Sequence, residues 1–471
     1  MKIEQIYTGC LAEAAYYIES NGEAAIIDPL RETRPYIERA EKDHAKIRYV
    51  FETHFHADFV SGHLDLARKT GALIVFGPTA SPDYKAHIAD DNELFKLGNV
   101  YIKVLHTPGH TLESTTYLLI DEDGKEKAIF TGDTLLIGDV GRPDLVQKVK
   151  ADITPEYLAG KLFDSLRIKI MTLPDDVVVY PGHGAGSACG KNMSKETTDS
   201  LGHQKLVNYA LRADMTRDEF IKEVIDGLVE PPQYFPQNVL INLHGGIQSI
   251  DEVIRRGSRD LSVKEFQTIW ETLDALVLDT RKKEDFVKGH IPGSIFIGLD
   301  DNFAPWAGTL IADLQQPILL ITEPGREQEA VMRLARVGFD KTMGVLNGGI
   351  EEWQRVGEVV DTIDCISGET FSEIYSHNVP LLDVRRKSEF DSEHIIGALN
   401  IPLDFINQQM NLIDKHKKYF VYCAGGYRSV IFISIMKARG FHKMVNIVGG
   451  YNDLSKTDLG RSERQERRTM L

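Results

Sequence analysis

The stretch ETHFHADFVSG, residues 52–62, decides the fold of the first half of this 471-residue chain. It follows the apolar run IRYVF and places His54, His56 and Asp58 at alternating positions, as a metal-binding loop does. The next residue is Phe59, at a point where a site for two metal ions would need one more ligand. The loop therefore offers ligands for a metal but ends in a ring that has no lone pair to donate.

Three further motifs downstream carry metal-ligand side chains after apolar runs: His110 in HTPGHT, Asp133 in FTGDT and His183 in YPGHG. Loops that follow strands are where a rigid sheet displays its functional groups. Taken singly, such a histidine or a Gly-Asp pair is usually an ordinary turn or surface residue. Together, the order HxHxD, TPGHT, TGD and PGHG predicts one shared metal site.

On these four motifs, residues 1–250 resemble the metallo-β-lactamase fold, an αββα sandwich. The resemblance implies that a second metal would need a histidine at position 59, so Phe59 leaves a site for a single ion. Two imidazoles and one carboxylate leave open positions for O₂ and substrate on Fe(II). This pattern resembles the persulfide dioxygenases, which implies one Fe(II) per chain held by His54, His110 and Asp133. The resemblance also implies that ligands or metal-bound water are oriented by His56, Asp58 and His183. A zinc site made of His54, His56 and His110 is the alternative.

Two loops beside these motifs carry residues with a predicted role in substrate chemistry. Arg142, in LIGDVGRPDL, is expected to hold an anionic thiol carrier. Cys189 lies in the glycine-rich loop that follows His183. We expect a helix to begin after it, and a helix N-terminus beside Lys191 would favour the thiolate. The loop resembles that of dioxygenases fused to sulfurtransferases, so Cys189 is interpreted either as a sulfur-handling thiol or as a buried apolar residue.

The second half of the chain repeats itself. The segments ALVLDTRKKEDFVKGHIPGSIFIGL (275–299) and PLLDVRRKSEFDSEHIIGALNIPL (380–403) share an apolar strand, Asp-x-Arg, a short helix and a histidine. A spacing near 100 residues indicates tandem α/β domains, and the alternation of strand and helix indicates parallel sheets. We therefore expect three domains, at 1–250, 260–360 and 365–463, with the proline-rich segment near 230 leading towards a linker.

The last copy contains VYCAGGYRS, residues 421–429. Successive backbone N–H groups before a helix form a cradle for anions, which would stabilise a thiolate and hold a persulfide on Cys423. With Asp383 and Arg385 upstream, the pattern resembles rhodanese, a sulfurtransferase. Only four residues separate Cys423 from Arg428, which favours sulfur over the phosphate of phosphatases. The resemblance implies that Cys423 and Arg428 are catalytic and that the substrate is bound by Gly425, Gly426 and Ser429.

The middle copy lacks the thiol. The segment LLITEPGREQ is parallel to FVYCAGGYRS, and we expect Ile321 in the place of Cys423 and Arg326 in the place of Arg428. We expect this domain to be inactive as a sulfurtransferase and to serve packing, spacing or oligomerisation.

The composition argues against some classes of function. The formal net charge of −16 argues against a nucleic-acid partner, and no run approaches the roughly 18 apolar residues of a membrane span. Four cysteines without CxxC spacing predict free thiols in a reducing cytoplasm. We also expect a homo-oligomer.

The two resemblances together imply one function. The first domain would oxidise a low-molecular-weight thiol persulfide with O₂ to sulfite, and the last would join sulfane sulfur to sulfite as thiosulfate. The carrier thiol stays open among glutathione, coenzyme A and bacillithiol. The alternatives are a zinc thioester hydrolase like glyoxalase II with an appended sulfurtransferase, and a non-catalytic sulfur-carrier protein.

Overall fold

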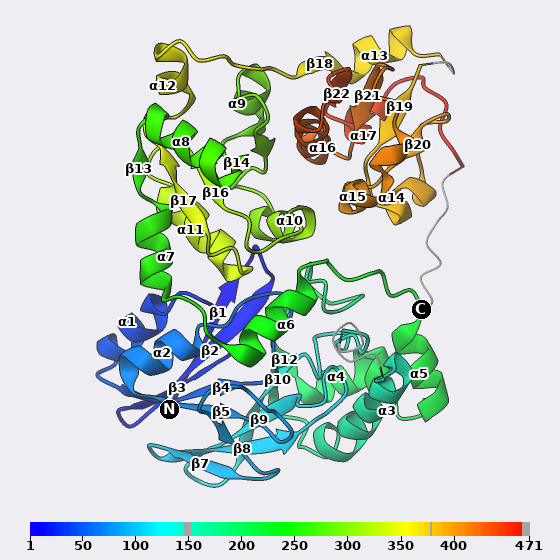
Figure 1. The fold of residues 1–471 in the computed structure, drawn as a ribbon. Helices are drawn as coiled ribbons and strands as arrows, with labels where there is room; N and C mark the ends of the chain where they lie inside the picture. Colours follow the sequence, from blue (N-terminus) through cyan, green and yellow to red (C-terminus); the bar gives the residue numbers. More distant parts are fainter. Residues whose placement is uncertain (146–151, 377–378, 464–471) are drawn as a thin grey trace. The chain divides into compact units, whose positions relative to one another are not determined.

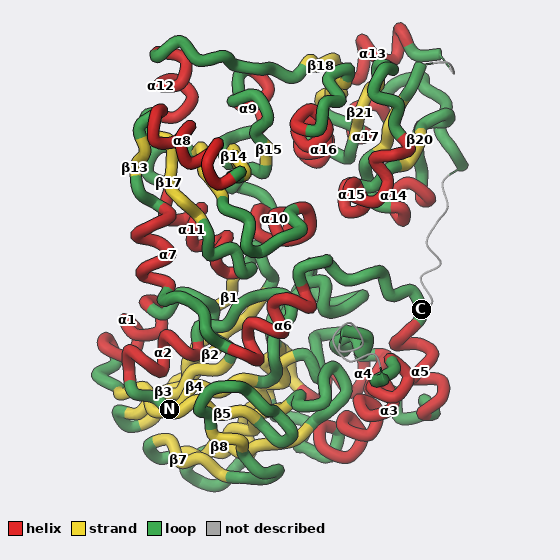
Figure 2. Tube along the Cα trace, viewed as in Figure 1, coloured by secondary structure: helices red, strands yellow, loops and turns green. Residues whose placement is uncertain are grey.

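The computed structural model describes residues 1–145, 152–376 and 379–463 (Figures 1 and 2). The chain forms two compact units. One comprises Met1–Glu252 together with Met332–Asp340, and the other comprises Val253–Val331 and the described residues from Lys341 onward. None of the described helices is both long and apolar enough to cross a membrane.

The first unit contains two six-stranded sheets. In order across the first sheet, the strands are β1 (Lys2–Thr8), β2 (Glu13–Ser20), β3 (Glu23–Ile27), β4 (Lys46–Glu52), β5 (Leu73–Phe76) and β6 (His87–Ile88). The second sheet runs in the order β12 (Asp199–Ser200), β11 (Val178–Pro181), β10 (Glu126–Gly132), β9 (Thr115–Ile120), β8 (Val100–His106) and β7 (Leu94–Leu97).

Alternation along β2 shows how the two sheets form a sandwich. Tyr16 and Ile18 pack into a core shared with Ile102 and Leu119 of the other sheet. Tyr17, between them in sequence, packs into a separate core with helix residues. Successive side chains of a strand point to opposite faces, so a strand covered on both faces is apolar throughout.

Helices cover the outer faces of both sheets. Those of this unit are α1 (Arg34–Lys42), α2 (His63–Thr70), α3 (Pro155–Ser165), α4 (Leu201–Val207), α5 (Arg217–Ile225) and α6 (Phe235–His244), and α7 (Ile250–Gly257) begins in it. Figure 1 shows α1 and α2 on one side and α3, α4 and α5 on the other. The expected αββα sandwich is confirmed. Gly71 ends α2 in the left-handed conformation, φ 73°, which glycine adopts without strain at a helix C-terminus.

The second unit contains two five-stranded parallel sheets of identical strand order. The first runs β13 (Asp260–Leu261), β17 (Thr342–Leu346), β16 (Ile318–Ile321), β14 (Leu276–Asp279) and β15 (Ile295–Phe296). Its helices are α8 (Val263–Leu273), α9 (Lys283–Lys288), α10 (Phe303–Leu310), α11 (Glu327–Arg336) and α12 (Gly349–Arg355). The second sheet runs β18 (Asp364–Ser367), β22 (Met444–Val448), β21 (Tyr419–Tyr422), β19 (Leu381–Asp383) and β20 (Leu399–Asn400). Its helices are α13 (Gly368–Ile374), α14 (Lys387–Ser392), α15 (Ile406–Gln409), α16 (Tyr427–Ala438) and α17 (Tyr451–Leu454).

The two copies repeat their buried polar contacts as well as their strands. Arg281 binds the Asp279 carboxylate and the carbonyl of Gly289. Arg385 binds Asp383 and the carbonyl of Glu393 in the same way. Each copy also stacks a histidine on a phenylalanine four residues earlier. The tandem α/β domains predicted from the repeat are therefore confirmed, and the Asp-x-Arg motif is a structural ion pair in both.

The strand register corrects one prediction. Asp279 pairs with Ile321 in the middle copy, and Asp383 pairs with Tyr422 in the last. Ile321 therefore corresponds to Tyr422, and the residue in the place of Cys423 is Thr322. The assignment of Ile321 to that place was wrong because an apolar strand slides by one residue without any change in its sequence pattern. The middle copy still has no thiol there.

Candidate metal site and cysteine loop

Three predicted ligands meet where three strands end. His54 follows β4, Asp133 follows β10, and His110 lies in the turn between β8 and β9. Their ligand atoms all lie within 4.8 Å of one another, and all three side chains are buried. Asp133 Oδ2 is 3.4 Å from His110 Nε2 and 4.0 Å from His54 Nε2, and it has no hydrogen-bond partner among the described residues. A buried carboxylate oxygen without a partner, facing two imidazole nitrogens, fits a metal ion.

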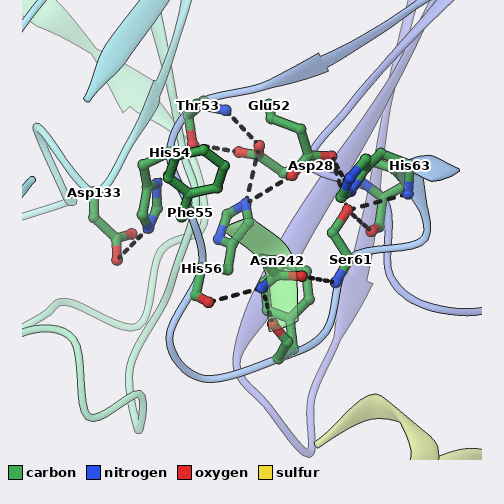
Figure 3. Close-up of polar contacts among 12 residues, drawn as sticks. Asp28, Glu52, Thr53, His54, Phe55, His56, Ser61, His63, Asp133 and Asn242 are labelled. Carbon is green, nitrogen blue, oxygen red and sulfur yellow. Dashed lines mark hydrogen bonds and ion pairs between the residues drawn. The ribbon is translucent and has the colours of Figure 1, made fainter. Parts of the chain in front are cut away.

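Hydrogen bonds at Nδ1 of His54 and His110 determine which ring nitrogen of each histidine has a free lone pair. Thr53 Oγ1 donates to Asp28 Oδ2 (2.7 Å), so it accepts from His54 Nδ1 (2.9 Å; Figure 3). His110 Nδ1 donates to the carbonyl of Arg142 (2.8 Å). Both Nδ1 atoms then carry the proton, and both Nε2 lone pairs are free to bind metal.

Charges in the site favour the same ligand set. Burial, together with the neighbouring His56 and His110, lowers the pKa of His54 well below its ordinary value, which keeps the ring neutral. Burial alone would raise the pKa of Asp133, but the adjacent His183 outweighs it, and the carboxyl group stays ionised. Neutral imidazole and carboxylate are the forms that bind Fe(II) or Zn(II).

His56 belongs to a different cluster. Its Nε2 lies 3.1 Å from Asp28 Oδ1 and 3.7 Å from Glu52 Oε2, and its ring stacks on Phe59 with 4.2 Å between centroids. Its ligand atoms group with those of Asp28 and Glu52 (Figure 3). They do not group with those of His54 and His110. This placement favours the two-histidine set over the three-histidine zinc alternative.

Asp58 and His183 lie beside the three ligands. His183 Nδ1 is 2.7 Å from Asp133 Oδ1, and its Nε2 is 2.8 Å from Asp58 Oδ2. Burial opposes protonation of this ring, but the two carboxylates outweigh it and raise the pKa of His183 well above its ordinary value. Both ring nitrogens are thus engaged, and Phe59 is completely buried and offers no ligand. A second metal ion here would require His183 to break one of these bonds.

Cys189 is close to this pair, but the expectation of a favoured thiolate was wrong. Lys191 Nζ binds the carbonyls of Glu223 and Asp226, and the next helix, α4, begins only at Leu201. Burial and the nearby Asp58 raise the pKa of the thiol well above its ordinary value. Its sulfur nevertheless lies within 4.8 Å of ligand atoms of Asp58 and His183, so a role in sulfur handling stays a prediction.

Arg142 holds the loop rather than facing open space. Its guanidinium makes two bonds to Asp144 (2.6 and 2.7 Å) and further bonds to the carbonyls of Ala188 and Val229. Its main-chain carbonyl is the group that orients His110. A substrate anion would have to compete with Asp144 for this side chain, and the predicted contact with a thiol carrier stays a prediction.

In the cysteine loop of the last copy, most of the residues predicted for the site lie close to Cys423. Cys423 is buried at the end of β21, and its sulfur accepts a bond from Gly426 N (3.1 Å). Ser429 Oγ lies 3.7 Å from the sulfur and donates to Asn446 Oδ1. Gly426 has φ 87° and precedes α16, a conformation that glycine adopts without strain.

Arg428 and Gly425 of the same loop have other partners. Arg428 makes a bidentate pair with Glu389 (2.6 and 2.8 Å), which fixes its guanidinium at the start of α16. The carbonyl of Gly425 accepts from Lys283 of the middle copy.

Several residues around these sites were not found from the sequence: Asp28, Thr53, Asn242 and Glu389. Asp28 ends the apolar run EAAII and Thr53 immediately precedes His54, which are weak signals. Asn242 and Glu389 have no motif, and only the tertiary fold brings them close.

Comparison with known proteins gives a separate family match for each half of the chain. Residues 8–183 match the metallo-beta-lactamase superfamily, and residues 262–356 and 369–457 match the rhodanese-like domain. The crystal structure of a metallo-beta-lactamase from Staphylococcus aureus subsp. aureus COL is 33% identical, with a TM-score of 0.64, and the match covers 73% of this chain and 98% of that one.

Two of the similar proteins have names that state different activities. Persulfide dioxygenase ETHE1 of Mus musculus is 30% identical over 230 residues, 48% of this chain and 81% of its own length. Cytoplasmic hydroxyacylglutathione hydrolase of Arabidopsis thaliana is 32% identical over 188 residues, 39% of this chain and 67% of its own length. The chain belongs to the metallo-beta-lactamase superfamily, with a metallo-beta-lactamase domain followed by two rhodanese-like domains.

Proposed function

We propose that this protein is an iron-dependent persulfide dioxygenase joined to a thiosulfate-forming sulfurtransferase. The observation that carries the proposal is the buried group of His54, His110 and Asp133, two imidazoles and one carboxylate with an unpartnered oxygen. The persulfide dioxygenases among its relatives and the rhodanese-like copies support it. The remaining expectations, a homo-oligomer in the cytoplasm, stay predictions.

The first reaction would be RSSH + O₂ + H₂O → RSH + SO₃²⁻ + 2 H⁺. Fe(II), held by His54, His110 and Asp133, would supply the oxygen chemistry. Thr53 and the Arg142 carbonyl keep the two imidazoles oriented. His183 holds Asp133 by its second oxygen, so Oδ2 is left for the metal. Burial of the whole group excludes bulk water from the reacting persulfide.

The second reaction would be RSSH + SO₃²⁻ → RSH + S₂O₃²⁻ through Cys423. The thiolate sulfur attacks the terminal sulfur of the persulfide, RSH leaves, and the new Cys423 persulfide passes that sulfur to sulfite. Gly426 N, 3.1 Å from the sulfur, is placed to stabilise negative charge on it. Arg428, held by Glu389, adds a positive charge near the loop.

The second candidate is a zinc thioester hydrolase with the same appended domains. Hydroxyacylglutathione hydrolases among the relatives favour it, at up to 33% identity. Metal identity and O₂ use separate the two, because thioester hydrolysis consumes no O₂.

The test is metal content with O₂ uptake after anaerobic purification. We expect about one Fe(II) per chain, O₂ uptake on a low-molecular-weight persulfide, and loss of both in His110→Ala. The matched control is His106→Ala, in the same HTPGHT motif but bonded to the Leu112 carbonyl, outside the ligand group. Two zinc ions per chain, thioester hydrolysis and no O₂ uptake would contradict the proposal.

A further inference from the structure

The segment expected to lead towards a linker contributes a side chain to the ligand loop. Asn242, on α6, is 3% exposed. Its Nδ2 donates to the carbonyls of His56 and Phe59, each at 2.8 Å, and its Oδ1 accepts from Ser61 N at 2.9 Å (Figure 3). One side chain thus binds three main-chain groups that surround Asp58.

The loop needs these bonds because it is buried and irregular. Residues 53–62 are all buried and form no helix or extended strand. Buried carbonyl and N–H groups that lie outside regular structure must find partners other than water. Asparagine presents two donors on one nitrogen and an acceptor oxygen beside it, whereas ionised aspartate has only acceptors and leucine has neither donor nor acceptor. The identity of the three partners also fixes which end of the amide is nitrogen.

Helix α6 is also anchored to residues outside the loop. Val239 and Leu243 pack against the apolar cluster that contains Phe55 and Phe76. Tyr84 donates its hydroxyl proton to the main-chain carbonyl of Asn242 at 2.7 Å. Contacts outside the loop, with Tyr84 and with Phe76 of β5, therefore help to hold the Asn242 amide in place.

We propose that Asn242 is a positioning residue of the metal site, which holds the turn from His56 to Ser61 and thereby fixes His54 in its ligand geometry. The inference rests on the proposed metal centre. Removing the amide leaves two buried carbonyls and one N–H without partners, and the turn relaxes into a set of conformations. Mutation of residues that orient the ligands without touching the metal typically changes metal affinity by about 10- to 100-fold.

The chain supplies a matched control. Asn238 lies one turn earlier on α6, is completely buried, and has no hydrogen-bond partner for either amide atom among the described residues. Asn242→Ala and Asn238→Ala therefore remove the same atoms from the same helix, but only the first removes bonds to the ligand loop.

The experiment measures Fe(II) affinity by anaerobic chelator competition, and ligand geometry by electron paramagnetic resonance of the nitric oxide adduct. We expect Asn242→Ala to bind Fe(II) at least about tenfold more weakly, with an altered adduct spectrum. We expect Asn238→Ala to match the parent in both, and Asn242→Gln, which keeps the amide, to recover part of the affinity. If Asn242→Ala does not fold, the test compares Asn242→Gln with Asn242→Asp. The Asn242→Gln variant should then bind Fe(II) more tightly than the Asn242→Asp variant.

Fe(II) affinity and adduct spectrum of Asn242→Ala equal to those of Asn238→Ala would overturn the inference. So would Asn242→Asp matching Asn242→Gln when Asn242→Ala cannot be measured. A parent chain that binds no Fe(II) contradicts the proposed metal centre instead, and the same comparison is then made with Zn(II) alone.

Discussion

At the scale of single residues, two buried thiols have different surroundings. Cys189 and Cys423 are both buried. Cys189 lies beside the Asp58 carboxylate and the His183 ring, and no helix start among the described residues aims an N–H at its sulfur, whereas the sulfur of Cys423 accepts from Gly426 N. The sequence predicted the Cys423 environment because the glycine loop and the helix are local. It did not predict that of Cys189, because Asp58 and the Lys191 partners come from distant positions.

Alkylation with iodoacetamide tests this difference. A pKa raised above the ordinary thiol value means less thiolate at neutral pH, so Cys189 should react more slowly than an ordinary thiol at pH 7.5. Its rate should keep rising with pH above 9, where an ordinary thiol levels off. Peptide mass spectrometry over a pH series measures both. Rapid, pH-independent labelling of Cys189 in the folded chain would show that its thiolate is stabilised.

At the scale of elements, the ligand loops are held together by close backbone approaches that leave no room for side chains. A Cβ at Gly141 would lie 2.1 Å from the Asp133 carbonyl and 2.9 Å from His110 Nδ1. The turn that contains Arg142 can reach His110 only because position 141 has no side chain.

Gly141→Ala should therefore lower the free energy of unfolding by about 1–3 kcal/mol, because the new methyl group meets backbone that cannot yield. It should also reduce Fe(II) content, since the displaced turn carries the carbonyl that orients His110. Denaturant unfolding and metal analysis measure the two effects. Gly9→Ala, with nothing within 4 Å of the added Cβ, is the control. Full stability and full iron in Gly141→Ala would show that the turn adapts.

Element prediction from the sequence was accurate where a pattern is local and poor where it is not. The strands before the ligand loops and the repeat were predicted, because the periodicity of apolar residues reports backbone geometry directly. The role of α6 was missed, since proline density near 230 suggested a linker while the contacts of Asn242 lie about 180 residues away in sequence. The one-residue error at Ile321 arose because β-strand pairing, and not the apolar run, sets the register.

At the scale of the whole molecule, the proposed function would make the fusion a source of sulfite joined to a consumer of sulfite. A tether raises the effective concentration of one site for the other's product when its length allows both to act together. Of the two rhodanese-like copies only the last has a thiol, because Thr322 replaces cysteine in the middle one. All sulfur transfer by these copies should therefore pass through Cys423.

The most direct test supplies persulfide and O₂ to the intact chain and measures sulfite and thiosulfate. Thiosulfate should be the main product of the parent, and Cys423→Ser should give sulfite instead, with iron content and O₂ uptake unchanged. Cys365→Ser, which alters an exposed thiol outside the loop, should behave as the parent does. If the intact chain releases only sulfite, or if Cys423→Ser still yields thiosulfate at the parent level, the account of coupled oxidation and transfer is contradicted.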